Sequence, residues 1–486
     1  MRDYLLYVNG AWHRGGSGTM PATNPSTGES FASVAVADLE DVDRAVAAAS
    51  VAFVSWARLS AFERATCCES VAAALRLRRE ELARALTEDQ GKPLVAEAYG
   101  EVDELCEYFH MAGEDAKRLE GSMPPSTSAN ARVLVSRVPL GVVGVVSPWN
   151  WPYTMGAEVF APALAAGNTV VWVPAPTTSA CSGLLAEIIA EGGLPPGVFN
   201  FLPGPGAVVG DAVVSHPGVD AVGFVGSVAT GRRVAERAAG KTQVLELGGN
   251  GPMVVLEDAD LELAAEATLE AAYLCAGQSC TAGERFLVHS SVRQEFVERV
   301  VAATAERVRL GDPLDPSTTM GPLNNEANAS KFDAHVGAAR EGGAIVRCGG
   351  QRASGFPTGL FAEPTVLEGV TGDMMIARDE TFGPVVPVIE ISSDADALEI
   401  TNGSPFGLTA AVFTEDLERG LAFAEAARAG WVNINASTNL WESHLPFGGR
   451  SGSVSGRGRV GGRSLLEAFT EPKTVRFPAP RRSNKR

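Results

Sequence analysis

The sequence predicts an α/β fold built around mainly parallel sheets. Between residues 140 and 250, short apolar runs that can form buried strands alternate with helical patterns. This alternation is typical of parallel strands joined by right-handed crossovers. A second set of strands and helices follows from residue 251. Because 486 residues are too many for one simple core, we expect two or three domains.

The first third of the chain is predicted to be mostly helical. Asp38 is expected to begin one helix, whose inner face carries Val42, Ala45, Val46 and Ala49. Ser60 and Glu63 form a capping-box pattern, and the amphipathic run that follows predicts one long helix ending at Gly91.

The alternating segment predicts five buried strands and the helices between them. The strands are expected at residues 141–146, 168–174, 198–204, 221–227 and 243–249, with a helix over 179–191 and another that ends at Gly240. Strands that are so uniformly apolar are buried on both faces. The preceding segment ARVLVS (131–136) alternates polar and apolar residues, which predicts an exposed strand.

The later α/β set contains the segment AYLCAGQSCTAGER (272–285), which holds two cysteines. Asp260 is expected to cap a helix over 260–276, with Gly277 as its C-cap. This helix would carry Cys275 on its inner face as core packing and would leave Cys280 in the loop beyond it. Further apolar strands are expected near residues 384–392 and 407–414.

Composition excludes several classes of protein. The net charge of −18, from 40 basic and 58 acidic residues, opposes binding to nucleic acid or to an anionic membrane. No run of 18 apolar residues predicts a membrane span, and the N-terminus does not resemble a signal peptide. Seven thinly scattered cysteines favour free thiols in a reducing cytoplasm. The one basic run, residues 481–486, is expected to be a frayed end.

Most common catalytic motifs are absent or incomplete. The C-x4-C pair lacks further ligands at zinc spacing, so no metal site is expected, and no G-x-S-x-G elbow occurs. GKT (240–242) lacks the glycine of a P-loop, and GPGAVVG (204–210) has one residue too many for a dinucleotide motif. What remains is a cysteine thiolate with a carboxylate base. Taken alone, Cys280 would still be read as structural more readily than as catalytic.

Eight motifs in order resemble those of the NAD(P)-dependent aldehyde dehydrogenase superfamily. They are SPWNWP (147–152), PALAAGNTVV (162–171), FVGS (224–227), LELGG (245–249), GQSC (277–280), ETFGP (380–384), PFGG (446–449) and SGRGR (455–459). The similarity covers nearly the whole chain. It implies a Rossmann-like cofactor-binding domain, an α/β catalytic domain and a small β oligomerisation element.

The resemblance implies oxidation of an aldehyde to a carboxylic acid. Cys280 would be the nucleophile, and the Asn150 amide and the Cys280 backbone N–H would stabilise the thiohemiacetal oxyanion. Glu246 would be the base that activates water to hydrolyse the thioester. At the end of a buried strand, its pKa should be raised by desolvation.

The cofactor contacts implied by the resemblance are Ser147, Pro148, Trp149, Gly204, Gly226, Ser227, Gly248, Glu380 and Phe382. The chain departs from the family pattern where Val173 replaces a lysine and Pro176 a glutamate that grip the adenosine ribose. Loss of the carboxylate admits a 2′-phosphate, whereas loss of the lysine removes its attractive partner, so both NAD and NADP remain candidates. Val159 also stands where a lysine is common.

The implied substrate-pocket residues are Trp151, Glu158, Ser279, Thr281 and Trp441. The two tryptophans favour a hydrophobic or aromatic aldehyde. Glu158 and Glu442 would disfavour an anionic aldehyde if they face the pocket.

The resemblance also implies the organisation of the chain. Residues 1–120 and 140–250 would form the NAD(P)-binding domain, 251–450 the catalytic domain, and 121–139 with 468–486 the oligomerisation element. We expect a cytoplasmic homodimer or homotetramer, because an exposed apolar strand is an aggregation hazard unless it is paired. Three rivals remain: a CoA-acylating enzyme, which Glu246 argues against, a thiol esterase, and a non-catalytic nucleotide-binding or structural protein.

Overall fold

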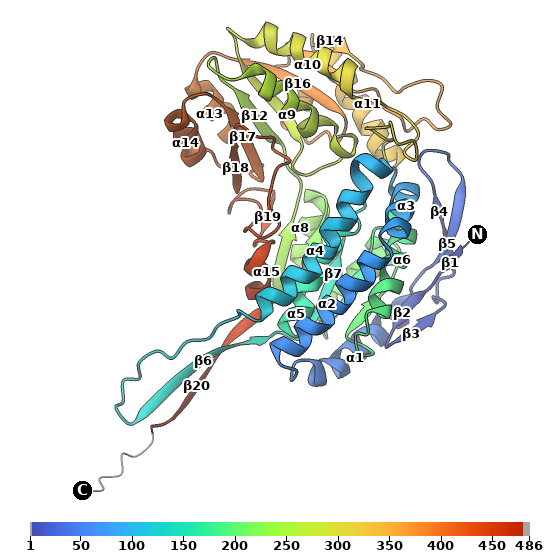
Figure 1. The fold of residues 1–486 in the computed structure, drawn as a ribbon, viewed down its shortest axis with the longest axis vertical. Coiled ribbons are helices and arrows are strands. Elements are labelled where there is room, and N and C mark those ends of the chain that lie inside the picture. The colour runs from blue at the N-terminus through green and yellow to red at the C-terminus, as the bar shows by residue number, and fades with distance from the viewer. Residues whose placement is uncertain (1, 480–486) are drawn as a thin grey trace.

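The fold consists of two α/β units, each built on a large sheet, and a long two-stranded arm that projects from them (Figure 1). The computed structural model describes residues 2–479. The predicted mixed α/β class is therefore confirmed. The basic tail, residues 481–486, and the end of the predicted oligomerisation element lie outside the described residues.

An eight-stranded sheet forms the core of the first unit. Its order is β19-β11-β10-β7-β8-β9-β2-β3, and the five strands from β11 to β9 run parallel. The strands are β2 (Leu6–Val8), β3 (Ala11–His13), β7 (Val142–Val146), β8 (Thr169–Val173), β9 (Phe199–Phe201), β10 (Ala221–Val225), β11 (Thr242–Glu246) and β19 (Gly456–Arg457). The five strands expected from the sequence are confirmed, although most are a few residues shorter at their ends.

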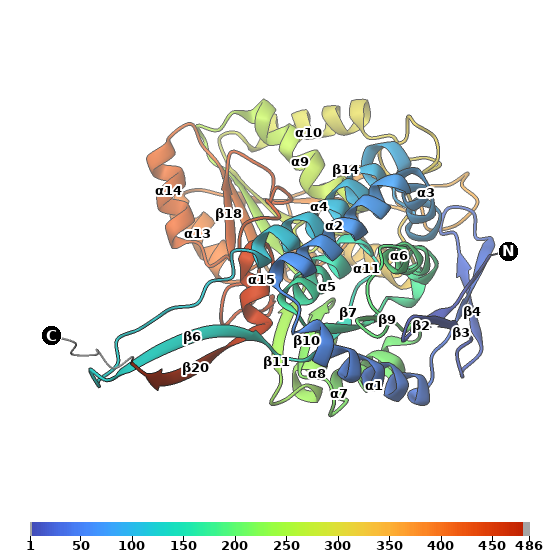
Figure 2. The ribbon, with the colours of Figure 1, turned by 60° about the horizontal axis from the view of Figure 1, so that its bottom comes forward.

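Helices cover both faces of this sheet (Figures 1 and 2). They are α1 (Leu39–Trp56), α2 (Ala61–Leu77), α3 (Arg79–Gln90), α4 (Tyr99–Ala116), α5 (Thr154–Ala166), α6 (Ser179–Glu191), α7 (Asp211–Ser215), α8 (Val228–Arg237) and α15 (Gly462–Ala468). A π-helical turn, η1 (Leu94–Ala98), precedes α4, and another, η3 (Gly206–Gly210), precedes α7. A 3-10 turn, η2 (Pro176–Thr178), leads into α6. A small sheet of β1 (Arg2–Tyr4), β5 (Ser30–Ala35) and β4 (Thr19–Thr23) lies at the N-terminal side.

The helix boundaries are explained by capping. Asp38 caps α1 and Ser60 caps α2, both with a complete capping box, as predicted. The expectation of one helix from Ser60 to Gly91 is wrong, because the chain leaves helical geometry at Arg78 (φ −107°, ψ 18°). The Arg78 guanidinium pairs there with Glu81 of the next helix, and Gly91 ends α3 in a left-handed conformation.

The second unit is built on a seven-stranded sheet in the order β14-β15-β16-β13-β12-β17-β18. Its strands are β12 (Gly251–Val255), β13 (Gly283–His289), β14 (Ile345–Cys348), β15 (Thr365–Glu368), β16 (Val385–Ile391), β17 (Thr409–Phe413) and β18 (Trp431–Ile434). Its helices are α9 (Leu261–Tyr273), α10 (Arg293–Arg307), α11 (Glu326–Glu341), α12 (Met375–Arg378), α13 (Asp394–Asn402) and α14 (Leu417–Ala426). The strands expected near 384–392 and 407–414 are confirmed.

The segment after α9 differs from the prediction. Asp260 caps α9 as expected, but the helix ends at Tyr273 and a tight turn, η4 (Leu274–Gly277), follows. Cys275 and Ala276 have φ values of 53° and 54°, a left-handed conformation that few non-glycine residues adopt. Cys275 therefore lies in this turn and not on the helix, although it is buried as predicted.

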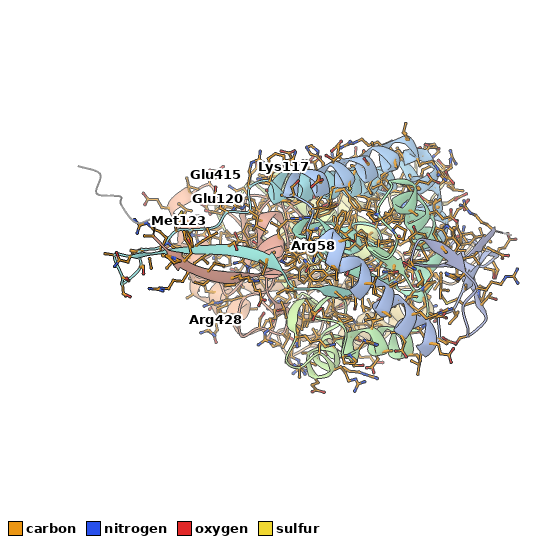
Figure 3. The ribbon with its side chains drawn as sticks, turned by 90° about the horizontal axis from the view of Figure 1, so that it is seen from below. Arg58, Lys117, Glu120, Met123, Glu415 and Arg428 are labelled. Carbon is orange, nitrogen blue, oxygen red and sulfur yellow. The ribbon has the colours of Figure 1, made fainter. Side chains whose placement is uncertain are left out.

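The arm pairs β6 (Ala131–Pro139) with β20 (Thr470–Pro478) in an antiparallel ladder of nine residue pairs. Figures 2 and 3 show it extending well away from both units, and Figure 3 shows Met123 beside it. A bridge between Ser122 and Val135 covers part of the other edge of β6, whereas β20 has no second neighbouring strand within residues 2–479. The exposed strand expected at 131–136 is confirmed.

Residues 2–479 contain neither a membrane-spanning helix nor a cluster of metal ligands. No helix there combines the length and apolar character needed to cross a membrane, and no group of three acidic, histidine or cysteine side chains is placed to hold a metal ion. All seven cysteines are free thiols.

Candidate active site

Two cavities meet at Cys280, which lies in the loop between η4 and β13. The first, here called the glycine cavity, is lined by Pro148, Trp149, Asn150, Met155, Val225, Gly226, Ser227, Glu246, Leu247, Gly248, Cys280, Asn328, Lys331, Glu380 and Phe382. The second, called the aromatic cavity, has a volume of about 220 Å³ and is lined by Glu104, Trp151, Thr154, Met155, Leu274, Ser279, Cys280, Thr281, Asn439, Leu440, Trp441 and Phe447. Cys280 and Met155 belong to both walls.

Glycines and the left-handed turn fix the position of Cys280. A Cβ atom on Gly249 would overlap the backbone oxygen of Cys280, and one on Gly277 would overlap the backbone of Gly383. The strand end LELGG can therefore approach the cysteine loop only because Gly249 has no side chain. This contact brings Glu246 and Cys280 to the wall of one cavity.

Cys275 holds the cysteine loop in place through contacts with two other segments of the chain. It is buried, its thiol accepts a hydrogen bond from the Gln90 amide (3.3 Å), and its backbone N–H donates to Glu97 (3.0 Å). The Cys275 thiol in turn donates to the backbone oxygen of Asn150 at 3.6 Å. These contacts describe a packing residue that links the cysteine loop to the loop after β7.

Asn150 follows β7 and points toward the cysteine loop. Its side-chain amide donates to the backbone oxygen of Gln278 at 3.0 Å, and the residue is buried. The amide therefore contacts the residue two positions before Cys280 and lies on the wall of the glycine cavity. A neutral donor in this position can stabilise an oxyanion without transferring a proton.

Glu246 is the last residue of β11 and is buried at the wall of the glycine cavity. Neither of its carboxyl oxygens has a hydrogen-bond partner within the described chain. Burial, and then the nearby Glu158 carboxylate, raise the pKa of Glu246 well above its usual value, while Arg459 lowers it in part. A carboxyl group with a raised pKa can accept a proton near neutral pH.

The thiol of Cys280 is also shifted by its surroundings. Burial raises the pKa of Cys280, and the carboxylates of Glu246, Glu380 and Glu158 raise it further. Forming the thiolate therefore requires a nearby proton acceptor or compensation of this negative charge.

The part of the glycine cavity farthest from Cys280 has features that suit binding of an anion and of a planar ring. Ser227 caps α8, and its hydroxyl accepts from the backbone of Thr230, so the unpaired N–H groups of the first helical turn lie beside Gly226. Glu380 accepts from the Gly249 backbone at 2.8 Å. The ring of Phe382 packs edge-on against Trp149, with 5.6 Å between centroids.

Buried hydrogen bonds hold the loop that carries Glu380 and Phe382. The Glu284 carboxylate accepts from the backbone N–H groups of Thr381 (2.6 Å) and Phe382 (2.8 Å). Asn328 donates to the Phe382 backbone oxygen at 2.7 Å, and Phe382 itself has φ 59°. These contacts compensate for the cost of a left-handed phenylalanine.

Three of the sequence-predicted residues lie away from both cavities. The Ser147 hydroxyl accepts from the Trp172 indole at 2.8 Å, and Gly204 packs against Val209. Glu158 lies on α5 toward Tyr108, at the wall of a separate small cavity. All the other predicted cofactor and pocket residues line one of the two cavities.

Val173 and Pro176, which depart from the family pattern at the end of β8, carry no charged group toward a cofactor. Val173 is fully buried in the core, and Pro176 is exposed at the start of η2. Glu442, considered for the pocket, has an exposed side chain (62%) and does not line the aromatic cavity.

Sequence reasoning missed several lining residues, of which Glu104 and Lys331 carry charge. A signal for Glu104 exists. Glu97, Glu101 and Glu104 recur at the spacing of one helical face, the same face as the buried Tyr108. Acidic residues on the inner face of a helix indicate a buried polar site.

Comparison with known proteins gives one result along the whole chain. Residues 12–475 match the family model described as aldehyde dehydrogenase family. The chain is 37% identical over 478 residues to alpha-ketoglutaric semialdehyde dehydrogenase of Bacillus subtilis, covering 97% of each protein. Among solved structures, an NAD-dependent aldehyde dehydrogenase from Sinorhizobium meliloti matches with TM-score 0.95 and 37% identity, covering 99% of this chain and 96% of that one. An NADP-dependent enzyme from E. coli matches with TM-score 0.95 and 35% identity, covering 98% of both chains.

Proposed function

The chain belongs to the aldehyde dehydrogenase family, and on this premise we propose that its aldehyde is oxidised through a thiohemiacetal and a thioester formed on Cys280. The reaction class is NAD(P)-dependent aldehyde oxidation. One observation carries the assignment of the nucleophile. Cys280 is the one cysteine in the walls of the glycine and aromatic cavities, and it lies in both, so it can contact a cofactor on one side and a substrate on the other.

The first step joins the substrate to the protein. The Cys280 thiolate attacks the carbonyl carbon, a C–S bond forms, and the carbonyl electrons move to oxygen. The Asn150 amide and the Cys280 backbone N–H donate to that oxyanion. A bound nicotinamide would supply the acceptor for the hydride that leaves this carbon. As the hydride leaves, the electrons on oxygen return to the C–O bond and the thioester remains on Cys280.

The second step releases the product. Glu246 takes a proton from water, the water oxygen bonds to the thioester carbon, and the C–S bond breaks. The acid leaves and the Cys280 thiolate is restored. The raised pKa of Glu246 supports this role, because it makes the carboxylate a stronger base, which accepts a proton from water more readily.

The residues of the glycine cavity fit a dinucleotide. The N-terminus of α8 with Gly226 and Ser227 can bind a pyrophosphate through backbone N–H groups. Glu380 and Phe382 are placed to contact the ribose and the nicotinamide ring. Val173 and Pro176 supply neither an attractive nor a repulsive charge for a 2′-phosphate, so both NAD and NADP are candidates.

The test is formation of NADH or NADPH at 340 nm with a panel of aldehydes and both cofactors. We expect turnover by the wild type, loss of turnover in Cys280→Ala, and retention of most turnover in the matched control Cys275→Ala. Tight nucleotide binding without turnover would contradict the proposal, as would loss of activity in Cys275→Ala alone.

We also propose a homodimer or homotetramer in the cytoplasm. The arm supports assembly, because β20 presents an edge without a second strand. The seven free cysteines support a reducing compartment. Sedimentation of the protein and of Val475→Asp, a change at an exposed position of β20 (43% exposed), would test the assembly; equal masses for the two would contradict a role for this strand.

A further inference from the structure

Among its described lining residues, the aromatic cavity has one acidic side chain, Glu104, besides the Cys280 thiol. No lysine, arginine or histidine is among its described lining residues. Three of its neutral polar groups are engaged with one another: Ser279 lies 2.9 Å from Thr281, which donates to Asn439 at 2.6 Å. The Thr154 hydroxyl is buried without a partner in the described chain, but it carries no charge. Glu104 is therefore the group in this wall that can select a substrate by charge.

Glu104 has almost no partner within the protein. Its one hydrogen bond, from the Tyr108 hydroxyl, is long at 3.3 Å, and no ion pair with it occurs within residues 2–479. The neighbouring Lys92 pairs instead with Glu101 at 2.5 Å. Burial, and then Glu101, raise the pKa of Glu104 to about 7, against the lowering effects of Tyr108 and Lys92. A cation in the cavity would stabilise the charged form of this carboxyl group.

Aromatic rings form much of the remaining wall. Trp441 and Phe447 pack with 4.8 Å between ring centroids, and Trp151 lies on the same wall. The Trp151 ring already holds an ammonium group, because Lys92 Nζ lies 3.5 Å from its centroid. Indole rings beside an unpaired carboxylate are the groups that bind organic ammonium ions in proteins.

We propose that the aromatic cavity selects aldehydes that carry an ammonium group, with the carbonyl at Cys280 and the cation between Glu104 and the aromatic wall. This inference rests on the proposed function of Cys280. It replaces the hydrophobic or aromatic aldehyde expected from Trp151 and Trp441, because an apolar substrate would leave the Glu104 carboxyl group buried without a partner. An anionic aldehyde would face repulsion from the same group.

The experiment compares substrates of equal shape and different charge. Trimethylammonioacetaldehyde is paired with 3,3-dimethylbutanal, and 4-(trimethylammonio)butanal with 5,5-dimethylhexanal, so that two chain lengths are covered; 4-oxobutanoate is the anionic member. We expect kcat/KM to be at least about tenfold higher for the cation in one pair, and lowest for the anion. Equal kcat/KM within both pairs, or preference for the anion, would overturn the inference.

Glu104→Gln tests the residue itself. The ratio of kcat/KM for cation over neutral isostere should fall by about tenfold, whereas Glu442→Gln, a change outside the cavity, should leave the ratio unchanged. An unchanged ratio in Glu104→Gln would refute the assignment of Glu104.

A third test uses only the wild-type protein, so its result does not depend on whether Glu104→Gln folds. Choline should inhibit oxidation of 3,3-dimethylbutanal competitively and about tenfold more strongly than its neutral isostere 3,3-dimethylbutan-1-ol; equal inhibition would overturn the inference. The two proposals fail separately. Absence of all turnover with both cofactors contradicts the proposed function, whereas turnover of the neutral aldehyde without a preference for the cation contradicts only the substrate class.

Discussion

Replacing Glu101 by glutamine should destabilise the protein strongly, although the two side chains have nearly the same shape. Both Lys92 and Glu101 have side chains with 0% exposure, and their charged atoms lie 2.5 Å apart. The other Glu101 oxygen accepts from the backbone N–H of Tyr153 at 3.0 Å, at the start of α5. Glutamine can keep the latter bond, but it must present either a weaker acceptor or an amide donor to the ammonium group.

The size of the effect follows from the distance. At 2.5 Å, and with an effective dielectric constant of about 20, the gross attraction is roughly 7 kcal/mol. Desolvation offsets part of it, so loss of one partner from a buried pair costs about 3–5 kcal/mol. Burial lowers and the Glu101 carboxylate raises the pKa of Lys92, with a net rise above its usual value. In the variant this compensation is lost, so the buried lysine either keeps an unpaired charge or gives up its proton, and both cost folding free energy.

Urea unfolding followed by tryptophan fluorescence, at one protein concentration, measures this cost. The control is the double variant Lys92→Met, Glu101→Gln, which removes both charges and should recover most of the lost free energy of unfolding. If Glu101→Gln lies within about 1 kcal/mol of the wild type, or if the double variant is no more stable than the single one, the pair does not contribute as described.

Three further predictions concern the active site. Glu246→Gln should allow one rapid turnover and then stop at the thioester. Its Cys280 should react faster with iodoacetamide at pH 7, because a negative charge that raises the pKa of the thiol is gone. Unchanged steady-state turnover would contradict the role of Glu246 as the base. Gly249→Ala should lower kcat by roughly a hundredfold, since the new Cβ displaces the Cys280 backbone, whereas Gly206→Ala, with nothing within 4 Å of the new Cβ, should retain activity. The preference for cationic over neutral aldehydes should rise as pH increases through about 7, because Glu104 ionises in this range. The titratable groups that face it are Glu101, Lys92, Tyr108 and Glu158. A ratio of kcat/KM for cation over neutral aldehyde that does not change with pH would refute this prediction.

The central residues of the site could be predicted from the sequence because they lie at the ends of strands or next to glycines. Glu246 ends β11 and Asn150 follows β7, and parallel strands bring their carboxyl ends to one edge of a sheet. The strand and helix periodicities that place these ends are local. The eight ordered motifs then identified Cys280 in the loop facing that edge.

What could not be predicted depends on contacts between distant segments. The turn at Cys275 and Ala276 is held by Glu97 and Gln90, and no local pattern indicates left-handed geometry at these two residues. Glu104 was missed because an acid on a helix is usually solvated. Its half-buried position depends on α4 packing against α5. The break at Arg78 likewise depends on ion pairs that include Glu191, far along the chain.

Four buried or half-buried carboxyl groups also make the folded state bind more protons than the unfolded chain does. Burial raises the pKa values of Asp89, Glu97, Glu104 and Glu380 to about 7, whereas in the unfolded chain such groups titrate near about 4. Between these values the folded protein holds protons that unfolding releases, so at these four positions the free energy of unfolding falls as pH rises from about 4 to about 7. Glu104 and Glu380 line the two cavities, and the same desolvation that prepares them for a ligand makes the empty protein less stable at neutral pH. A bound cation beside Glu104 would reverse that loss, so occupancy of the site and resistance to unfolding should increase together.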